Sequence, residues 1–424
     1  MAVVKPFSAL RFNTGNVSLQ QVIMPPYDII KDTSEYYESS PYNIVRIDKG
    51  EKLAGDTDSE NKYTRAAAFM KDWIDKNILK EDQKSGYYVY RQEYVLPDGK
   101  KKEMTGFFAA VKIEEFEKRI VLPHERTHSG PKADRLELMR ATKSNTSPIL
   151  SLYFDKEKKV HSILEKTAKA GPFMDFKDSK NIRYRMWKIE EGAEAQKIEA
   201  FMADKQLFIA DGHHRYETAM NFRNEMKAKN ESDTRFDSIM MCLISMEHSG
   251  ISILPTHRVK HKWNREKFEE DPMVEKYFVV KKFKNASEIR KVIVAPDHKK
   301  IIGVVSNSGC FTLEVKKDEY KKALERRERS TAYYMLDVSV LHGLLFTDIL
   351  KMDDSELFDG LEYTPDIDEA INAVVKSGAK ISFLIKPSTV GEVKEISLNN
   401  ETMPQKSTYF LPKLATGFLI NKMD

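Results

Sequence analysis

The stretch that decides the fold is QLFIADGHHRYETAMNFRNEMKA, residues 206–228. It opens with LFIA (207–210), a short apolar run of the kind that forms a buried strand. Asp211 and Gly212 follow as a turn signal. Apolar residues then recur at helical spacing from Tyr216 to Met226. The stretch therefore predicts a strand, a tight turn and a helix in direct succession.

Three polar side chains are predicted in the first turn of that helix: His213, His214 and Arg215. Free backbone N–H groups and the positive end of the helix dipole favour an anion at this position. Two imidazoles and a guanidinium add donors, and an arginine can bind two phosphate oxygens at once. The residues predict a phosphate cradle. In the alternative interpretation, Asp211 is only an N-cap and the two histidines are structural.

A second polar stretch, VLPHERTHSGPKADR (121–135), contains His124, Glu125 and His128 at the spacing of a zinc metalloprotease helix. Ser-Gly-Pro follows at residues 129–131 and is expected to break a helix directly after His128. We therefore expect no zinc, and a zinc metallopeptidase is the least favoured function.

The same loop is nevertheless typical of a functional site, because its polar side chains are dense. We predict that His124, Arg126 and Thr127 contact a substrate, and that Glu125 is a candidate catalytic base or magnesium ligand.

Two weaker motifs suit a polar pocket: LPTHRV (254–259) and MPQKSTYFLPK (403–413). The first places polar residues at the end of an apolar strand, and the second places an ammonium beside two hydroxyls without the glycines of a P-loop. A structural role for the histidine of the first motif is nearly as well supported. The predicted phosphate contacts in these motifs are His257, Arg258, Lys406, Ser407 and Thr408.

Helical and strand patterns alternate along the chain, which predicts a mixed α/β fold. A helix is expected over 61–79, a hairpin from YYVYRQEYV and MTGFFAAVKI, a short helix over 134–141 and a buried strand over 148–154. The length of 424 residues suits two domains. We place them at 1–260 and 261–424.

Composition excludes several classes of protein. Lys plus Arg (69) nearly balances Asp plus Glu (65), so specific nucleic-acid binding is not expected. Two cysteines favour a reducing compartment. The start of the chain lacks the apolar core of a signal peptide, and the longest apolar window, 339–350, is interrupted by His342 and Asp348. We expect a cytoplasmic protein with no membrane partner.

The motifs also occur in a familiar order: KPFSALRF, PPYDII, PHERT, DRLELM, SPILSLY, ADGHHRYETA, LPTHRV, LDVSVLH and MPQKSTYFLPK. In this order they resemble the family called domain of unknown function 1015, whose members are often labelled SpoOJ/ParA/ParB-like. The resemblance covers almost the whole chain. It implies a ParB/sulfiredoxin-like core with insertions, followed by a C-terminal α/β domain.

The turn ADGHHR is similar to the phosphate-binding turn of partition proteins, sulfiredoxins and free-serine kinases. This resemblance implies that His214 and Arg215 contact phosphate. His213 stands where sulfiredoxins have their reactive cysteine, so sulfiredoxin chemistry is excluded. No helix-turn-helix pattern follows Arg215, which is unlike the partition proteins that bind DNA.

The function we expect is a nucleotide-binding phosphotransferase that uses ATP or ADP with Mg²⁺ and acts on a small hydroxyl-bearing metabolite. Phosphoryl transfer needs positioned charges and an oriented nucleophile. Asp211 or Glu125 would serve as base or magnesium ligand, and His213 would line the transferred group. The alternative is a ParB-like nucleotide sensor that regulates a protein or DNA. Oligomeric state is left open.

Overall fold

The computed structural model describes residues 1–127, 129–230, 232–297, 299–324, 328–358 and 360–423. Both helices and strands occur throughout this part of the chain, so the prediction of a mixed α/β fold is confirmed.

Contacts divide the chain into two compact units, which we describe separately. Unit 1 comprises Met1–Ile251 and Pro412–Asp424, and unit 2 comprises Ser252–Leu411. The sequence analysis placed a single boundary near residue 260. In the structure the last residues of the chain return to unit 1, so the two units are not two consecutive segments.

Unit 1 is built on a large mixed sheet. Its strands are β1 (Val4–Lys5), β4 (Gly86–Val95), β5 (Lys101–Lys112), β6 (Val121–Leu122), β8 (Ile149–Tyr153), β9 (Met174–Lys177), β10 (Arg183–Glu190), β11 (Leu207–Asp211) and β12 (Ser238–Ser245). Their order is β6-β11-β8-β12-β5-β4-β10-β9, with β1 on β5. The pairs β6–β11 and β8–β12 are parallel and the others are antiparallel. The predicted hairpin is confirmed as β4 and β5, in which Tyr88 lies opposite Phe108.

Two short ladders complete the strands of unit 1. One joins β2 (Leu10–Phe12) to β3 (Leu79–Glu81), and the other joins β7 (Ser144–Asn145) to β21 (Asn421–Lys422). The helices are α1 (Leu19–Val22), α2 (Ser34–Ser39), α3 (Val45–Asp48), α4 (Lys62–Asp75), α5 (Ser129–Thr142), α6 (Lys159–Thr167), α7 (Ala193–Met202) and α8 (His213–Lys229).

The main core of unit 1 lies on one face of its sheet. Alternate residues such as Val89 and Phe107 are buried there, because side chains along a strand point to opposite faces. Helices α6, α7 and α8 place Leu164, Ile198 and Phe222 in the same cluster. The 3.6-residue period of these helices lets each bury one apolar stripe.

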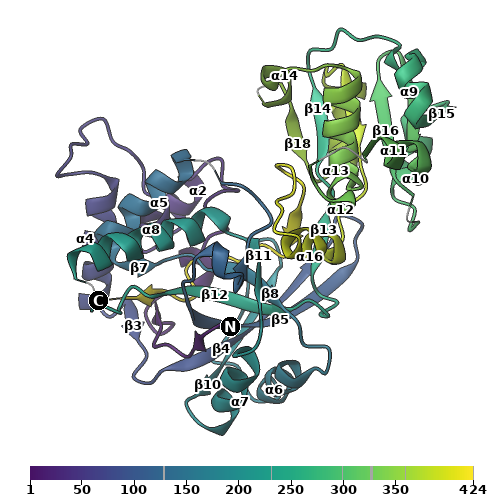
Figure 1. The fold of residues 1–424 in the computed structure, drawn as a ribbon. Coiled ribbons are helices and arrows are strands. Elements are labelled where there is room, and N and C mark those ends of the chain that lie inside the picture. Colours follow the sequence, from purple (N-terminus) through teal and green to yellow (C-terminus); the bar gives the residue numbers. More distant parts are fainter. Residues whose placement is uncertain (128, 231, 298, 325–327, 359, 424) are drawn as a thin grey trace. The chain divides into compact units, whose positions relative to one another are not determined.

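Helix α5 lies beside α8 (Figure 1). It begins at Ser129, so the expectation that residues 129–131 would break a helix was wrong. A proline is tolerated in the first turn of a helix, where its missing N–H has no intrahelical partner to lose. The helix expected over 134–141 is therefore longer at its start. Helix α4 ends at Asp75, before the predicted residue 79, and its start is fixed by a capping box between Asn61 and Thr64.

Aromatic side chains pack together elsewhere on the sheet of unit 1. Tyr90 of β4 contacts Phe108 of β5 edge to face. The ring centroids of Tyr184 of β10 and Phe418 are 5.1 Å apart. Phe418 comes from the returning C-terminal segment. This segment is therefore part of the hydrophobic interior of unit 1.

Unit 2 has an antiparallel sheet of its own. Its strands are β14 (His257–Lys260), β15 (Phe278–Phe283), β16 (Ile301–Ser306), β17 (Gly309–Val315), β18 (Glu362–Thr364) and β19 (Ile381–Leu384). Their order is β15-β17-β16-β19-β14-β18. A separate pair joins β13 (Ser252–Leu254) to β20 (Tyr409–Leu411).

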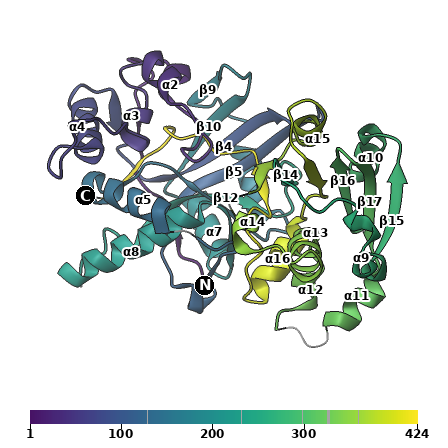
Figure 2. The same ribbon diagram turned by 90° about the horizontal axis from the view of Figure 1, so that it is seen from above.

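The helices of unit 2 are α9 (Pro272–Tyr277), α10 (Ala286–Ile293), α11 (Lys317–Leu324), α12 (Thr331–Tyr334), α13 (Asp337–Ser339), α14 (Asp354–Phe358), α15 (Ile367–Val375) and α16 (Val390–Leu398). Helices α10 and α15 pack on the sheet beside β16 and β14 (Figure 2), where Ile289 and Ala370 enter the core. The apolar window predicted from residues 339–350 forms a π-helix over Val340–Ile349.

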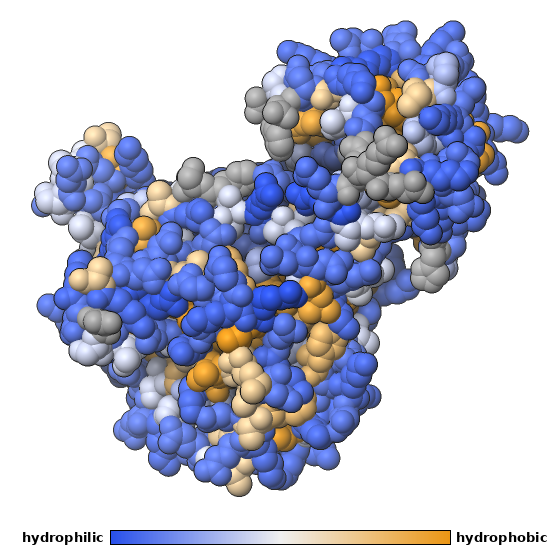
Figure 3. Space-filling view, in the orientation of Figure 1, coloured by the Kyte–Doolittle hydropathy of each residue, from blue (hydrophilic) through white to orange (hydrophobic). Residues whose placement is uncertain are grey.

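Among the described residues, no helix combines the length and the apolar character needed to cross a membrane. The face drawn in Figure 3 is largely hydrophilic, with a narrower apolar strip on unit 1. This surface agrees with a chain in which 32% of the residues are charged.

Candidate functional site

The site is organised by the turn between β11 and α8. The strand ends at Asp211, Gly212 adopts φ 97° and ψ 29°, and the helix begins at His213. A Cβ atom at residue 212 would lie 3.0 Å from the Arg215 guanidinium. Glycine is therefore needed both for the left-handed backbone and for the close approach of that side chain. The predicted strand, turn and helix are confirmed.

Asp211 is held between two cations. Its Oδ1 accepts a hydrogen bond from Lys413 at 2.7 Å, and its Oδ2 accepts one from Arg215 at 2.7 Å. Burial raises the pKa of this carboxyl, but the Lys413 ammonium and the Arg215 guanidinium outweigh it and hold the pKa well below its usual value. The N-cap of α8 is Gly212 and not Asp211. Asp211 is thus an ionised partner of two cations.

Arg215 is buried, with 7% of its surface exposed. One terminal nitrogen donates to the Asp211 carboxylate and the other to the Pro148 carbonyl. Its Nε is buried and has no hydrogen-bond partner in the structure. The two terminal nitrogens are committed to the protein here, so Nε is the donor that a ligand could use. A role for Arg215 in phosphate binding stays a prediction.

His213 joins this turn to the loop that carries PHERT. The His124 N–H donates to Nε2 of His213 at 3.2 Å, and His124 Nδ1 lies 2.7 Å from the Ile209 carbonyl oxygen, to which it donates. The two rings meet edge to face with centroids 4.6 Å apart. Burial lowers the pKa of His124 to about 4 and holds the pKa of His213 well below its usual value. Both imidazoles are therefore neutral near pH 7.

The PHERT loop is also attached to α8 by side chains. Thr127 Oγ1 donates to Glu217 at 2.6 Å, and Lys132 Nζ donates to the same carboxylate oxygen at 2.8 Å. Glu125 is half-buried and Arg126 is exposed. The structure thus brings together two motifs that the sequence analysis singled out separately, while their proposed chemical roles stay predictions.

The zinc motif of the opening loop is only partly described. His124 precedes α5 and lies on a loop, with its Nδ1 bonded to Ile209. His128 lies outside the described residues. Across the residues that the structure covers, no group of three or more side chains is arranged to hold a metal ion.

The remaining predicted phosphate contacts lie in unit 2. Arg258 is fully buried, and its Nε donates to His342 at 2.9 Å. Its terminal nitrogens donate to the carbonyls of Thr256 and Lys406. Burial lowers its pKa to about 10. The motifs LPTHRV, LDVSVLH and MPQKSTYFLPK therefore meet at this guanidinium.

The neighbours of Arg258 vary in accessibility. His257 is fully buried, and its Nδ1 accepts from the Ile385 N–H at 3.3 Å, as a structural histidine would. The Ser407 hydroxyl donates to the Pro404 carbonyl. Lys406 is exposed and Thr408 is half-buried. Their roles toward a ligand stay predictions.

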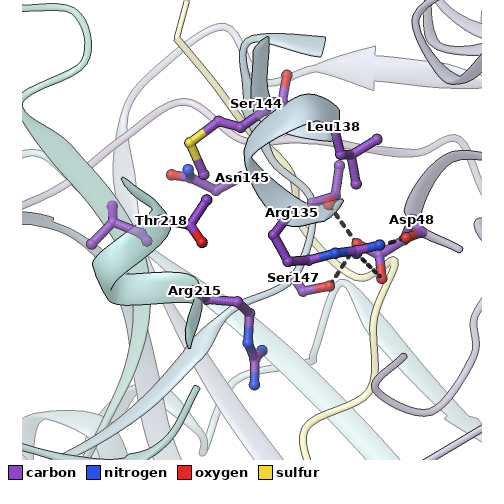
Figure 4. A pocket seen from close by; sticks show the side chains of 11 residues that line it. Asp48, Arg135, Leu138, Ser144, Asn145, Ser147, Arg215 and Thr218 are labelled. Atoms are coloured by element: carbon purple, nitrogen blue, oxygen red, sulfur yellow. Dashed lines mark hydrogen bonds and ion pairs between the residues drawn. The ribbon is translucent and has the colours of Figure 1, made fainter. Parts of the chain in front are cut away.

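A small pocket in unit 1 is lined by Arg215 together with residues that the sequence analysis did not select as site residues. Asp48, Arg135, Ser147 and Arg215 are among its lining residues, and its volume is about 30 Å³ (Figure 4). Arg135 lies within the quoted motif DRLELM. Asp48 ends the segment NIVRID, whose mixed polar and apolar residues gave no signal of a site.

Comparison with known proteins identifies the family. Residues 4–339 match the model described as "Protein of unknown function (DUF1015)". The chain belongs to this family. Its description names no activity. No match was found among curated proteins.

Solved structures similar to this member of the DUF1015 family include a mutant free serine kinase in complex with AMP. It is 12% identical, with 73% of this chain and 88% of that chain covered and a TM-score of 0.36. A conserved hypothetical protein from Pyrococcus furiosus is 14% identical, with coverages of 72% and 90% and a TM-score of 0.33. SbnI from Staphylococcus aureus, with a C-terminal truncation, is 11% identical, with coverages of 74% and 87% and a TM-score of 0.36.

Proposed function

We propose that this protein is a nucleotide-binding enzyme that transfers a phosphoryl group to a small hydroxyl-bearing metabolite. The observation that carries the proposal is the turn from Asp211 to Arg215. It presents the N-terminus of a 17-residue helix together with a guanidinium, an ammonium from Lys413 and an ionised carboxylate. A helix N-terminus with added cations is suited to phosphate. The resemblance of ADGHHR to the turn of free-serine kinases favours transfer of a phosphoryl group over simple binding.

The proposal includes ATP or ADP with Mg²⁺. Magnesium is usually held by the substrate phosphates and one or two carboxylates. Asp211 is ionised, as a magnesium ligand must be, although both of its oxygens already accept from cations. Glu125 is the second candidate ligand. When bound, the ion would neutralise phosphate charge.

The first prediction tests nucleotide binding. Millimolar ADP with Mg²⁺ should raise the melting temperature of the wild type, because a ligand specific for the folded state stabilises it. Arg215→Ala should remove most of this shift and weaken binding by about tenfold to a hundredfold or more, as expected for a lost charge-assisted contact. Thermal denaturation with and without ADP, together with calorimetric titration, measures both quantities.

Arg223→Ala is the matched control. Arg223 is also buried on α8, but it donates to the Ile113 carbonyl and to Glu115 instead of the turn. This variant should lose stability yet keep its response to ADP. Equal loss of the response in both variants would show that Arg215 acts only by supporting the helix. A wild type that binds ADP without any turnover on serine or other small alcohols would favour the nucleotide-sensing regulator.

A further inference from the structure

One face of helix α8 holds the PHERT loop (123–127) at two points. His213 and Glu217 are four residues apart in α8, so their side chains lie on the same face of the helix. The backbone N–H of His124 donates to Nε2 of His213 at 3.2 Å. The Thr127 hydroxyl donates to Oε2 of Glu217 at 2.6 Å. The loop is therefore attached to α8 near both of its ends.

The two attachment points fix the part of the loop that lies between them. Glu125 and Arg126 are its residues, and Glu125 directly follows the residue that is bonded to the first position of α8. Strand β6 ends at Leu122 and α5 begins at Ser129, so the connection has little spare length. Each hydrogen bond removes conformational freedom from so short a segment. Glu125 is thereby kept close to the turn that starts α8.

Glu217 also bonds to helix α5. Lys132 Nζ donates to the same carboxylate oxygen, Oε2, at 2.8 Å. This oxygen thus accepts both from the loop and from the helix that follows the loop. Only 21% of the Glu217 side chain is exposed, so salt and solvent screen the ion pair less than a pair on the surface. One partly buried carboxylate therefore joins three elements of the site.

A second carboxylate on α8 shows what is particular to Glu217. Glu225 lies about two turns further along the helix. It accepts hydrogen bonds from Arg140 of α5. Both carboxylates therefore join α5 to α8. The bond to the PHERT loop through Thr127 is what distinguishes Glu217.

We propose that Glu217 is a positioning residue that holds the PHERT loop on α8 and keeps Glu125 in place beside the ADGHHR turn. The inference rests on the proposed function, in which Glu125 is a candidate magnesium ligand or base. Glu217 bonds to the loop and to α5, so its effect on the reaction passes through Glu125. A displacement of about 1 Å near a reacting group can cost about a hundredfold in rate. Loss of Glu217 should therefore lower kcat, while the affinity for ADP, which we assign to the cations of the turn, should stay close to that of the wild type.

The experiment compares full-length variants in two measurements. The first is the rate of tryptic cleavage after Arg126, which is exposed in the loop, followed by mass spectrometry without any nucleotide. The second is phosphoryl transfer from ATP or ADP with Mg²⁺ to serine or glycerol, with kcat and the affinity for ADP determined separately. Glu217→Ala and Thr127→Val should each speed cleavage after Arg126 and lower kcat by about tenfold to a hundredfold. Neither should weaken the binding of ADP as Arg215→Ala does.

Three further variants separate position from charge and from helix packing. Glu217→Gln keeps an oxygen that can accept from Thr127, so it should retain slow cleavage and most of the wild-type kcat. Lys132→Met removes the ion pair but leaves the hydrogen bond of the loop. Glu225→Ala removes a contact between the two helices alone. Both should leave cleavage after Arg126 and kcat nearly unchanged.

The cleavage rates and kcat together show whether Glu217 positions the loop. If Glu217→Ala and Thr127→Val keep the wild-type cleavage rate and kcat, the inference is wrong. If Glu217→Gln loses as much kcat as Glu217→Ala, charge and not position matters, which also overturns it. An equal loss of kcat in Glu225→Ala would contradict it by showing a general effect of helix packing. If Glu217→Ala does not fold, Thr127→Val, which alters only the loop, gives the answer.

Failure of the proposed function has a different signature. A wild type that binds no ADP, or that transfers phosphate to no acceptor, removes the phosphotransferase and with it the role of Glu217 in transfer. Cleavage after Arg126 needs no nucleotide, so faster cleavage in Glu217→Ala would still show that this residue holds the loop. If transfer is present and the loop variants keep their kcat, the phosphotransferase stands and the inference about Glu217 is wrong.

Discussion

At the scale of single residues, burial rather than charge decides what the histidines of the site do. His124 and His213 are almost completely buried; the backbone N–H of His124 donates to the His213 ring, and the two rings pack edge to face. Burial disfavours the imidazolium form, so both rings stay neutral at physiological pH. They therefore join the PHERT loop to the turn as hydrogen-bonding groups and carry no positive charge for a phosphate.

This neutrality predicts a pH dependence of stability. In the unfolded chain a histidine takes up a proton near pH 6.5, whereas His124 in the folded protein does so at about pH 4. The unfolded state thus binds more protons between these values. The contribution of the neutral histidine to the free energy of unfolding should be fully present above about pH 6.5, and the free energy of unfolding should decrease as the pH falls toward 4.

Urea denaturation at several pH values measures this effect. The variant His124→Asn keeps a donor toward Ile209 and lacks a titrating group, so its free energy of unfolding should change less over the same pH range. His261→Asn is a suitable control, since His261 is exposed. An identical pH dependence in the wild type and His124→Asn would contradict the assignment.

At the scale of elements, the site depends on how β11 connects to α8. A single residue, Gly212, separates the strand from the helix, and its left-handed backbone directs the first helical turn across the Asp211 carboxylate. Lys413 approaches the same carboxylate from the returning C-terminal segment. The turn therefore sets the positions of the cations as well as the direction of the helix.

Gly212→Ala should disturb both stability and binding. A left-handed conformation costs a non-glycine residue about 1 to 2 kcal/mol, and the added Cβ would also press on Arg215 at 3.0 Å. We expect a lower melting temperature and weaker binding of ADP. Thermal denaturation with and without ADP measures both effects.

Gly99→Ala separates strain from crowding. Gly99 has φ 83°, and a Cβ atom added there would meet open space. This variant should therefore lose stability only through the strained backbone and should keep its affinity for ADP. If the two alanine variants bind ADP equally well, the contact between residue 212 and Arg215 has no bearing on the ligand.

At the scale of the whole molecule, unit 1 is closed by a segment from the far end of the sequence. Residues 412–424 pair β21 with β7, form bridges to Leu10 and Met24, and bury Phe418 and Ile420. The segment also supplies Lys413 to the site. Unit 1 is therefore incomplete until the chain has passed through unit 2.

Deletion of residues 412–424 should prevent stable folding of unit 1. Removing one large buried apolar side chain costs about 2 to 5 kcal/mol, and the segment buries several: Phe418, Leu419, Ile420 and Met423. The summed cost of losing these side chains is comparable with the whole free energy of unfolding of a typical domain, about 5 to 15 kcal/mol. Circular dichroism on heating should show no cooperative transition for unit 1 in the truncated chain.

Lys413→Met keeps the segment and removes the ion pair with Asp211. It should fold with a loss of about 1.5 to 3 kcal/mol, the value of a hydrogen bond to a charged group. A truncated chain that melts at the wild-type temperature would show that the C-terminal segment packs on unit 1 without stabilising it.

The sequence by itself determined the local parts of this protein. The hairpin of β4 and β5 and the strand, turn and helix from Leu207 to Lys229 follow from apolar periodicity and from turn residues a few positions apart, so short-range patterns predict them. The start of α5 was missed because a Ser-Gly-Pro run can begin a helix as well as end one. Which of the two it does depends on the packing of α5 against α8.

Only the tertiary structure decided which side chains share a site. Asp211 meets Lys413 across 202 positions of sequence, and Asp48 meets Ser147 across 99. Likewise Arg258, predicted from its motif to contact phosphate, is buried against His342 and backbone carbonyls. A motif records residue types and spacing, but burial and hydrogen-bond partners depend on segments that are distant in sequence. That is why the sequence could predict the turn, while the pocket at Asp48 emerged only when the chain was folded.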